Sequence, residues 1–246
     1  MMRPDSTPGG HAFLTTRWSL VLLAAGSDGA GASQEALESL CRGYWQPLYF
    51  FARRQGHGPE AAEDFTQDFF ALLTSRDLLQ KAQPEKGRFR SYLLGVMKNI
   101  MAQAHDRESR SKRGGGVAPL SLDCMEAEER YRLCPADTET PEVAFDRHWA
   151  RTVMERAVAR LTEDYTASGQ AERFVVLKEY LLTGRQEMAG AAAAASLGMT
   201  DAALRSAIFK VRQRFAAALR AEVAETVSSA EEAEEELRHL AKMLAA

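Results

Sequence analysis

Basic side chains flank a polar stripe in the segment SLGMTDAALRSAIFKVRQRF, residues 196–215. At about 100° per residue of an α-helix, small or polar side chains fall opposite an apolar face. A helix that enters the major groove of DNA needs this layout, because small side chains approach the base edges while cations reach the phosphates on both sides. The candidate DNA contacts are Thr200, Ala202, Arg205, Ser206, Phe209, Lys210, Arg212, Gln213 and Arg214.

The alternative is a solvated helix whose Arg and Lys only keep the protein soluble. Phe209 weighs against it, because a solvated face gains nothing from an exposed aromatic side chain. The preceding residues predict a helix-turn-helix: alanines 191–195 favour a helix, Gly198 suits its left-handed C-cap, and Thr200 suits the N-cap of the next helix. The apolar stripe of that next helix is predicted to contain Leu204, Ile208, Val211, Phe215 and Leu219.

Charge is segregated along the 246-residue chain, whose formal net charge is −3. Residues 86–113 carry eight Lys or Arg against two Asp or Glu, and residues 201–220 carry five against one. Residues 123–142 and 221–246 each carry seven acidic and two basic side chains. A solvated surface usually interleaves its signs, so the pattern indicates two polyanion-binding modules, with chance clustering as the alternative.

Motifs for catalysis are absent from the sequence: it has no Gly-rich phosphate loop, no metal-ligand spacing and no nucleophile motif. We therefore expect no enzyme activity, no metal and no cofactor. Cys41, Cys124 and Cys134 share no CxxC or Cys/His spacing, which indicates reduced thiols in a cytoplasmic protein. No apolar run approaches 18 residues, so we expect no membrane span.

Helical periodicity dominates and strand signals are weak, so the elements that position these residues are predicted to be helices. Apolar residues keep 3-and-4 spacing from Leu37 to Phe51, in a helix that ends near Gly56. A second helix begins near Pro59, and its acidic side chains fall opposite an apolar stripe. That stripe is predicted to contain Ala62, Phe65, Phe69, Leu72 and Leu73. A third helix starts at Phe89, with Phe89 and Tyr92 on its apolar side.

The sequence thus predicts an all-α fold of two small helical domains joined by an extended acidic linker, with the helix-turn-helix in the second. Residues 117–141 hold three prolines and an acidic majority with little periodicity, which is typical of a linker. The predicted parts are an N-terminal arm with a short helix at 1–31, a first domain at 32–116, the linker at 117–141, a second domain at 142–222 and an acidic helical extension at 223–246.

Three segments, in this order, resemble the extracytoplasmic-function (ECF) group of bacterial RNA polymerase sigma factors. AAEDFTQDFF (61–70) resembles the family's Asp-Ala-Glu-Asp-Leu-Val-Gln-Glu-Thr-Phe, and FRSYLLGVMKNIMAQAHDRESRSKR (89–113) resembles its Phe-Arg-Ala-Trp-Leu, Ala-Arg-Asn and basic tail. LGMTDAALRSAIFKVRQRF (197–215) resembles Leu-Gly-Ile-Ser-Val-Gly-Thr-Val-Lys-Ser-Arg-Leu-His-Arg-Ala-Arg. The chain departs from the pattern where Ala207 and Phe209 replace Arg and His.

The resemblance implies a sigma domain two-like module at 32–116 and a sigma domain four-like module at 142–222. The acidic helix would dock on the clamp helices of core RNA polymerase, the third helix and its basic tail would read the minus-ten promoter element, and the helix-turn-helix would read the minus-thirty-five element. The implied polymerase contacts are Glu60, Glu63, Asp64, Gln67 and Asp68. The implied minus-ten contacts are Lys86, Arg88, Arg90, Lys98, Asn99, Arg107, Arg110, Lys112 and Arg113.

One other function for the chain remains open. A stand-alone helix-turn-helix regulator explains the second module but neither the acidic helix nor the first basic segment. An anti-sigma factor or another regulator is a further candidate partner. The acidic tail is predicted to form an amphipathic helix that either folds back on a basic module and hinders promoter binding, or only solubilises the C-terminus.

Overall fold

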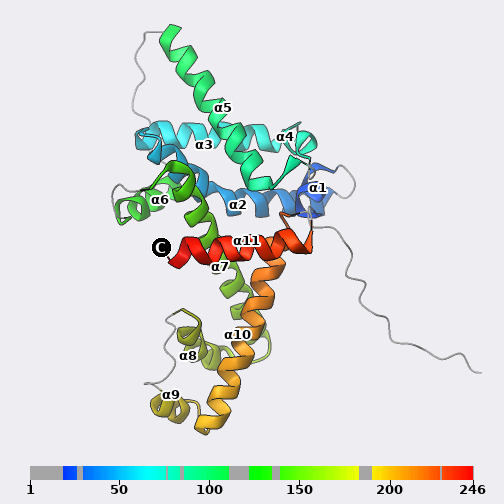
Figure 1. The fold of residues 1–246 in the computed structure, drawn as a ribbon, viewed down its shortest axis with the longest axis vertical. Helices are drawn as coiled ribbons and strands as arrows, with labels where there is room; N and C mark the ends of the chain where they lie inside the picture. The colour runs from blue at the N-terminus through cyan, green and yellow to red at the C-terminus, as the bar shows by residue number, and fades with distance from the viewer. Residues whose placement is uncertain are drawn as a thin grey trace, which may run out of the picture.

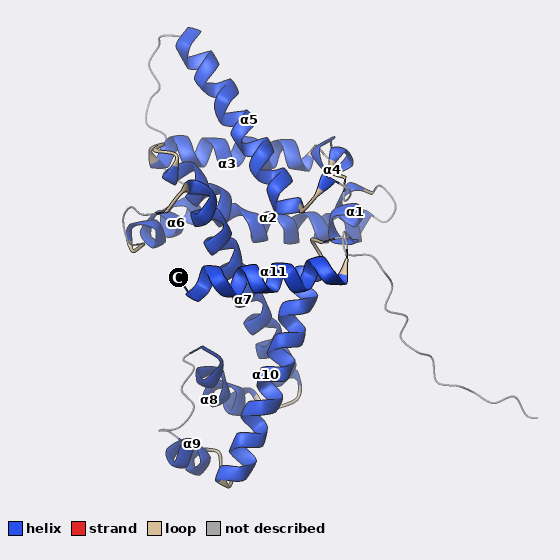
Figure 2. Ribbon diagram, viewed as in Figure 1, coloured by secondary structure: helices blue, strands red, loops and turns tan. Residues whose placement is uncertain are grey.

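The computed structural model describes residues 19–26, 30–75, 77–83, 86–110, 122–134, 139–182, 190–227 and 229–245. Every secondary-structure element in these ranges is a helix, which confirms the predicted all-α class (Figure 2). Within them, each helix is too short or too polar to cross a membrane. The first helices are α1 (Ser19–Ala25), α2 (Ala30–Arg54), α3 (Pro59–Thr74), α4 (Asp77–Lys81), α5 (Phe89–Arg110) and α6 (Leu122–Arg132). The others are α7 (Pro141–Ala167), α8 (Ala171–Leu182), α9 (Gly190–Ser196), α10 (Asp201–Ala224) and α11 (Ala230–Ala245).

Helix α2 is the centre of a bundle that also contains α1, α3 and the first half of α7. The periodic residues from Leu37 to Phe51 are buried there, as the sequence predicts. Aromatic side chains fill the same core, with Phe69 of α3 and Phe89 of α5 fully buried. Helix α2 ends before Gly56, whose positive φ of 91° reverses the chain at little steric cost.

Helix α6 replaces part of the predicted extended linker. Its Cys124, Ala127 and Glu128 are buried against the bundle, and Tyr131 packs against the same core. These four positions have the i, i+3, i+4, i+7 spacing of one helix face. The stripe is narrow and contains a carboxyl group, so the acidic composition around it outweighed the helical signal in the sequence.

Helix α7 runs without interruption through two hydrophobic cores. Phe145, Trp149 and Val153 belong to the core around α2, whereas Leu161 and Tyr165 belong to a second core with α8, α9 and α10. Figure 1 shows α7 and α10 descending together from the bundle towards α8 and α9. The boundary between the cores therefore falls inside α7. The assignment of sigma-like domains to these parts stays a prediction.

Helix α11 is the predicted acidic C-terminal helix. It packs on α7 and α10 and lies across both of them below α2 in the view of Figure 1. Ala233 and Leu240 are buried in the core around α2, together with Val223 in the last turn of α10 and Val227 in the segment that follows it. The chain end is therefore folded back on the bundle that its N-terminal half forms.

Candidate polymerase and DNA interfaces

The acidic helix α3 begins where its sequence predicts. Gly58 is the N-cap in an extended conformation, Pro59 is the first helical residue and Glu60 lies in the first turn. Ala62, Phe65, Phe69 and Leu73 are buried, whereas Leu72 of the predicted apolar stripe is 46% exposed. Four of the five proposed polymerase contacts are exposed on the other side, namely Glu60, Asp64, Gln67 and Asp68.

Glu63 is the exception, and its predicted position on the exposed face is wrong. It is only 6% exposed, and Gln67 Nε2 donates to its Oε1 at 3.1 Å. Helix α6 lies on this side of α3, which puts Glu63 close to Cys124. Burial, with the charge and hydrogen bonding of Glu63, raises the pKa of the Cys124 thiol to about 11. Glu63 therefore belongs to the contact between α3 and α6.

The proposed minus-ten contacts divide into exposed and paired side chains. Lys86 and Asn99 are exposed. Lys98 of α5 is exposed as well, but its Nζ lies 2.7 Å from Glu142 of α7 and 5.9 Å from the centroid of the Phe51 ring. Arg107 and Arg110 lie in the last turns of α5, but their side chains are outside the described part of the chain, as are Lys112 and Arg113 entirely.

Arg88 and Arg90 are engaged by carboxylates from the other end of the chain. Glu236 of α11 accepts from Arg90 Nε and Nη2, the latter at 3.2 Å, and lies 3.0 Å from Arg88 Nη1. Asp146 of α7 accepts from Arg90 Nη1. Arg90 is buried and its guanidinium lies 5.4 Å from the centroid of the Trp149 ring. In this arrangement Arg90 is not accessible to a phosphate group.

The buried environment nonetheless favours a charged Arg90. Burial alone would lower its pKa, but hydrogen bonding and the charges of Glu236 and Asp146 raise the pKa above its ordinary value. The sequence did not identify Glu236 of α11 or Asp146 of α7 as a partner of Arg90. The only signal for Glu236 was the group of five glutamates within residues 231–236, because local patterns do not show a partner 146 residues away.

The caps at the junction between α9 and α10 are those predicted from its sequence. Gly198 has a positive φ of 62°, and Thr200 caps α10 by accepting from Ala203 N at 3.2 Å. Leu204 and Val211 are buried, and the other residues of the predicted stripe, Ile208, Phe215 and Leu219, pack against the same core.

The face of α10 opposite that stripe is open to solvent. Its small and polar residues are exposed, and Phe209 is 62% exposed. The exposed candidate contacts on α10 and at its cap are Thr200, Ala202, Arg205, Ser206, Phe209, Lys210, Gln213 and Arg214. Cations therefore border a row of small and polar side chains and one aromatic ring, the arrangement a base-reading helix requires.

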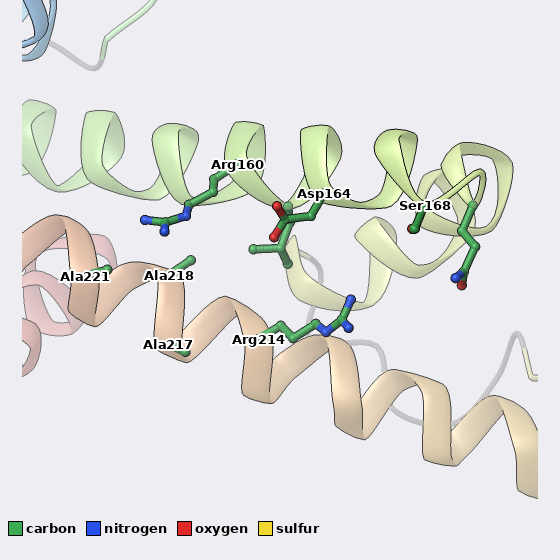
Figure 3. Close-up of a pocket in the computed structure, with 9 residues that line it drawn as sticks. Arg160, Asp164, Ser168, Arg214, Ala217, Ala218 and Ala221 are labelled. Carbon is green, nitrogen blue, oxygen red and sulfur yellow. The ribbon is translucent and has the colours of Figure 1, made fainter. Parts of the chain in front are cut away.

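Two arginines of α10 also have roles within the fold. Arg212 Nη2 donates to the carbonyl of Tyr180 at 3.2 Å, which ties α10 to α8. The Arg214 guanidinium lies 5.3 Å from the centroid of the Tyr165 ring. Figure 3 shows Arg214 directed towards α7 across a cavity of about 510 Å³ whose lining includes Arg160, Asp164 and Ala217. Arg205 and Lys210 are therefore the cations of α10 most directly presented to a ligand.

Comparison of the chain with protein-family models, curated proteins and solved structures finds no match. Among the described residues, no group of three or more His, Cys, Asp and Glu side chains is placed to hold a metal ion. The candidate site is thus a pair of surfaces, the acidic face of α3 and the basic and polar face of α10. The paired residues Arg88 and Arg90, at the start of α5, lie between these two helices in the sequence.

Proposed function

We propose that the protein is an ECF-type sigma factor, which binds core RNA polymerase in the cytoplasm and directs it to promoters. The observation that carries the proposal is that one chain exposes two surfaces of opposite charge, each on a different helix. Helix α3 exposes Asp64 and Asp68, and α10 exposes Arg205 and Lys210 beside small and polar side chains. An acidic face suits a basic protein partner, and the face of α10 suits a DNA groove.

Promoter recognition would divide between α5 and α10. Helix α10 would read the duplex of the minus-thirty-five element, with Phe209 where the related pattern has His. Of the candidate contacts for the minus-ten element, Lys86 before α5 and Asn99 within α5 are exposed. Opening of the duplex requires unstacked bases to be captured while cations hold the backbone. No step of this function needs catalysis by the chain itself.

A stand-alone DNA-binding regulator is the second candidate, and the exposed face of α10 favours it. The two candidates differ in their need for polymerase. Run-off transcription with core RNA polymerase and genomic fragments should yield defined start sites only when this protein is added. Tight promoter binding without polymerase, together with no start sites in its presence, would reject the sigma-factor proposal in favour of the regulator.

A further inference from the structure

The start of α5 and the middle of α11 are joined by a carboxylate that two arginines share. Glu236 is 1% exposed and contacts both Arg88 and Arg90. Glu235, one residue earlier, lies 3.5 Å from Arg88 Nη2. Helix α11 therefore supplies negative charge to two of the basic residues that precede or begin α5.

The contact extends to α7 through a second carboxylate. His239 of α11 lies one turn from Glu236, and its Nε2 is 2.9 Å from Asp146 Oδ2. Asp146 in turn binds Arg90. Arg90 is thereby held between a carboxylate on α11 and a carboxylate on α7, with the Trp149 ring near its guanidinium. Displacement of α11 would remove one of these two carboxylates and uncover this side of Arg90.

Apolar contacts anchor α11 in this position. Leu240 is 4% exposed in the core around α2, and Leu237 and Met243 pack against that core. Arg147 Nε of α7 donates to the carbonyl of Met243 at 3.2 Å. By contrast, the pair between Glu234 and Arg220 of α10, at 2.8 Å, is 55% exposed on both sides and adds little to the anchoring.

DNA phosphates can replace the carboxylates of α11 on these arginines, because both groups bind guanidinium in the same way. Phosphate groups and carboxylates both accept charged hydrogen bonds from guanidinium groups. The cost of removing buried charges from water offsets much of the attraction between Glu236 and Arg90, so the pair fixes geometry more than it adds free energy. The attachment of α11 to the same chain makes it an effective competitor even when its intrinsic affinity is modest.

We infer that α11 is an autoinhibitory clasp that occupies Arg88 and Arg90, and that single-stranded promoter DNA must displace it before these arginines can bind the nucleic acid backbone. The inference rests on the proposed function for the identity of the competing polyanion. It assigns a regulatory role to the acidic tail. The sequence alone allowed two roles for this tail, masking of a basic module and solubilisation of the C-terminus.

The test compares two single charge removals on the same helix. Glu236→Gln removes the buried carboxylate, and Glu234→Gln removes an exposed one two residues away with the same change in net charge. Binding of a fluorescent single-stranded oligonucleotide to the full chain is measured by anisotropy at low salt, without polymerase. We expect Glu236→Gln to bind at least about fivefold more tightly, the lower end of ordinary coupling between sites. This gain should shrink as salt is added.

A second pair of variants changes the anchoring without changing charge. Leu240→Ala removes a buried side chain of α11, and Leu244→Ala removes one that is 43% exposed. Only Leu240→Ala should raise oligonucleotide affinity. Hydrogen exchange should show faster exchange in residues 230–245 of Leu240→Ala while amides of α2 and α3 stay protected, which separates release of α11 from global unfolding.

Equal oligonucleotide affinities for Glu236→Gln and Glu234→Gln would overturn the proposal that α11 is autoinhibitory. Faster amide hydrogen exchange in α11 of Leu240→Ala without tighter oligonucleotide binding would also overturn it. This comparison does not use polymerase. If the wild-type protein failed to support run-off transcription, the sigma-factor proposal would be rejected. The competition between α11 and a polyanion would still be tested by the binding measurements.

Discussion

Arg53 of α2 binds both carboxylate oxygens of Glu128 on α6, with Nε 2.8 Å from Oε2 and Nη2 3.0 Å from Oε1. The hydroxyl of Tyr49 donates to the same Oε2 at 2.8 Å. Burial would raise the Glu128 pKa, but these hydrogen bonds and the Arg53 charge lower it below its ordinary value. The carboxylate thus fastens α6 to the central helix of the bundle.

Glu128→Gln should destabilise the protein by about 3 kcal/mol, because loss of one partner leaves Arg53 half-buried without its counter-charge. The free energy of unfolding is measured by urea denaturation at pH 7. Glu129→Gln makes the same charge change at the adjacent exposed position and should change stability by less than about 0.5 kcal/mol. Equal effects of the two variants on the free energy of unfolding would show that Glu128 affects stability only through the net charge of the protein.

His148 should make the protein sensitive to acid. Its pKa is lowered from 6.5 to about 3, first by burial and then by the charges of Arg151, Arg54 and Arg147. The unfolded chain therefore takes up a proton over a range in which the folded chain does not. The stability due to neutral His148 is fully present above pH 6.5 and declines as the pH falls towards 3.

Replacement of His148 should flatten that decline. We expect stability of the wild type to fall between pH 6.5 and 4.5 by up to roughly 1.4 kcal/mol per pH unit, and His148→Gln to show a shallower slope whatever its absolute stability. Urea titrations at several pH values measure the slopes. His105→Gln, at an exposed position of α5, should retain the wild-type slope. Parallel profiles for wild type and His148→Gln would contradict the assignment.

Reversal of charge on α3 should abolish binding to core polymerase. Asp64→Lys combined with Asp68→Lys leaves the core untouched, because both side chains are exposed. The double variant should no longer co-purify with core enzyme, since its face would repel a basic partner surface. The control is Glu163→Lys with Glu172→Lys, which makes the same total charge change at exposed positions of α7 and α8. Undiminished co-purification of the α3 variant would remove α3 from the interface.

Arg205→Ala should weaken binding to minus-thirty-five duplex by a similar factor for all sequences. Loss of one phosphate contact should reduce the slope of log affinity against log salt by about 1. Arg42→Ala, which removes an exposed arginine of α2, should leave that slope unchanged. Phe209→Ala should instead alter the preferred sequence. If Phe209→Ala weakened binding to every duplex equally, Phe209 would not contact the bases.

Local signals located most helices in advance, because caps and periodicity act within a few residues. Pro59 at the start of α3 and Thr200 at the cap of α10 are examples. Exposure of the polar face of α10 followed from the same helical geometry. The orientation of individual side chains towards other elements was not predictable in this way.

Glu63 and Arg90 illustrate what sequence reasoning missed. Each lies at a position that periodicity and resemblance treat as available to a partner, and each is buried by a distant segment of the chain. Glu63 is covered because residues 122–132 form a helix, and Arg90 because α11 returns to the bundle. Such contacts depend on long-range packing of an acidic helix, for which composition gives no position.

The uninterrupted course of α7 has a consequence for how the molecule comes apart. Its 27 residues extend about 40 Å and place Trp149 in one core and Leu161 in the other. Helical hydrogen bonds connect the two halves, so melting of one half removes a packing surface that the other core requires. On heating, the two cores should lose structure in a single calorimetric transition, because both cores pack against the same uninterrupted helix.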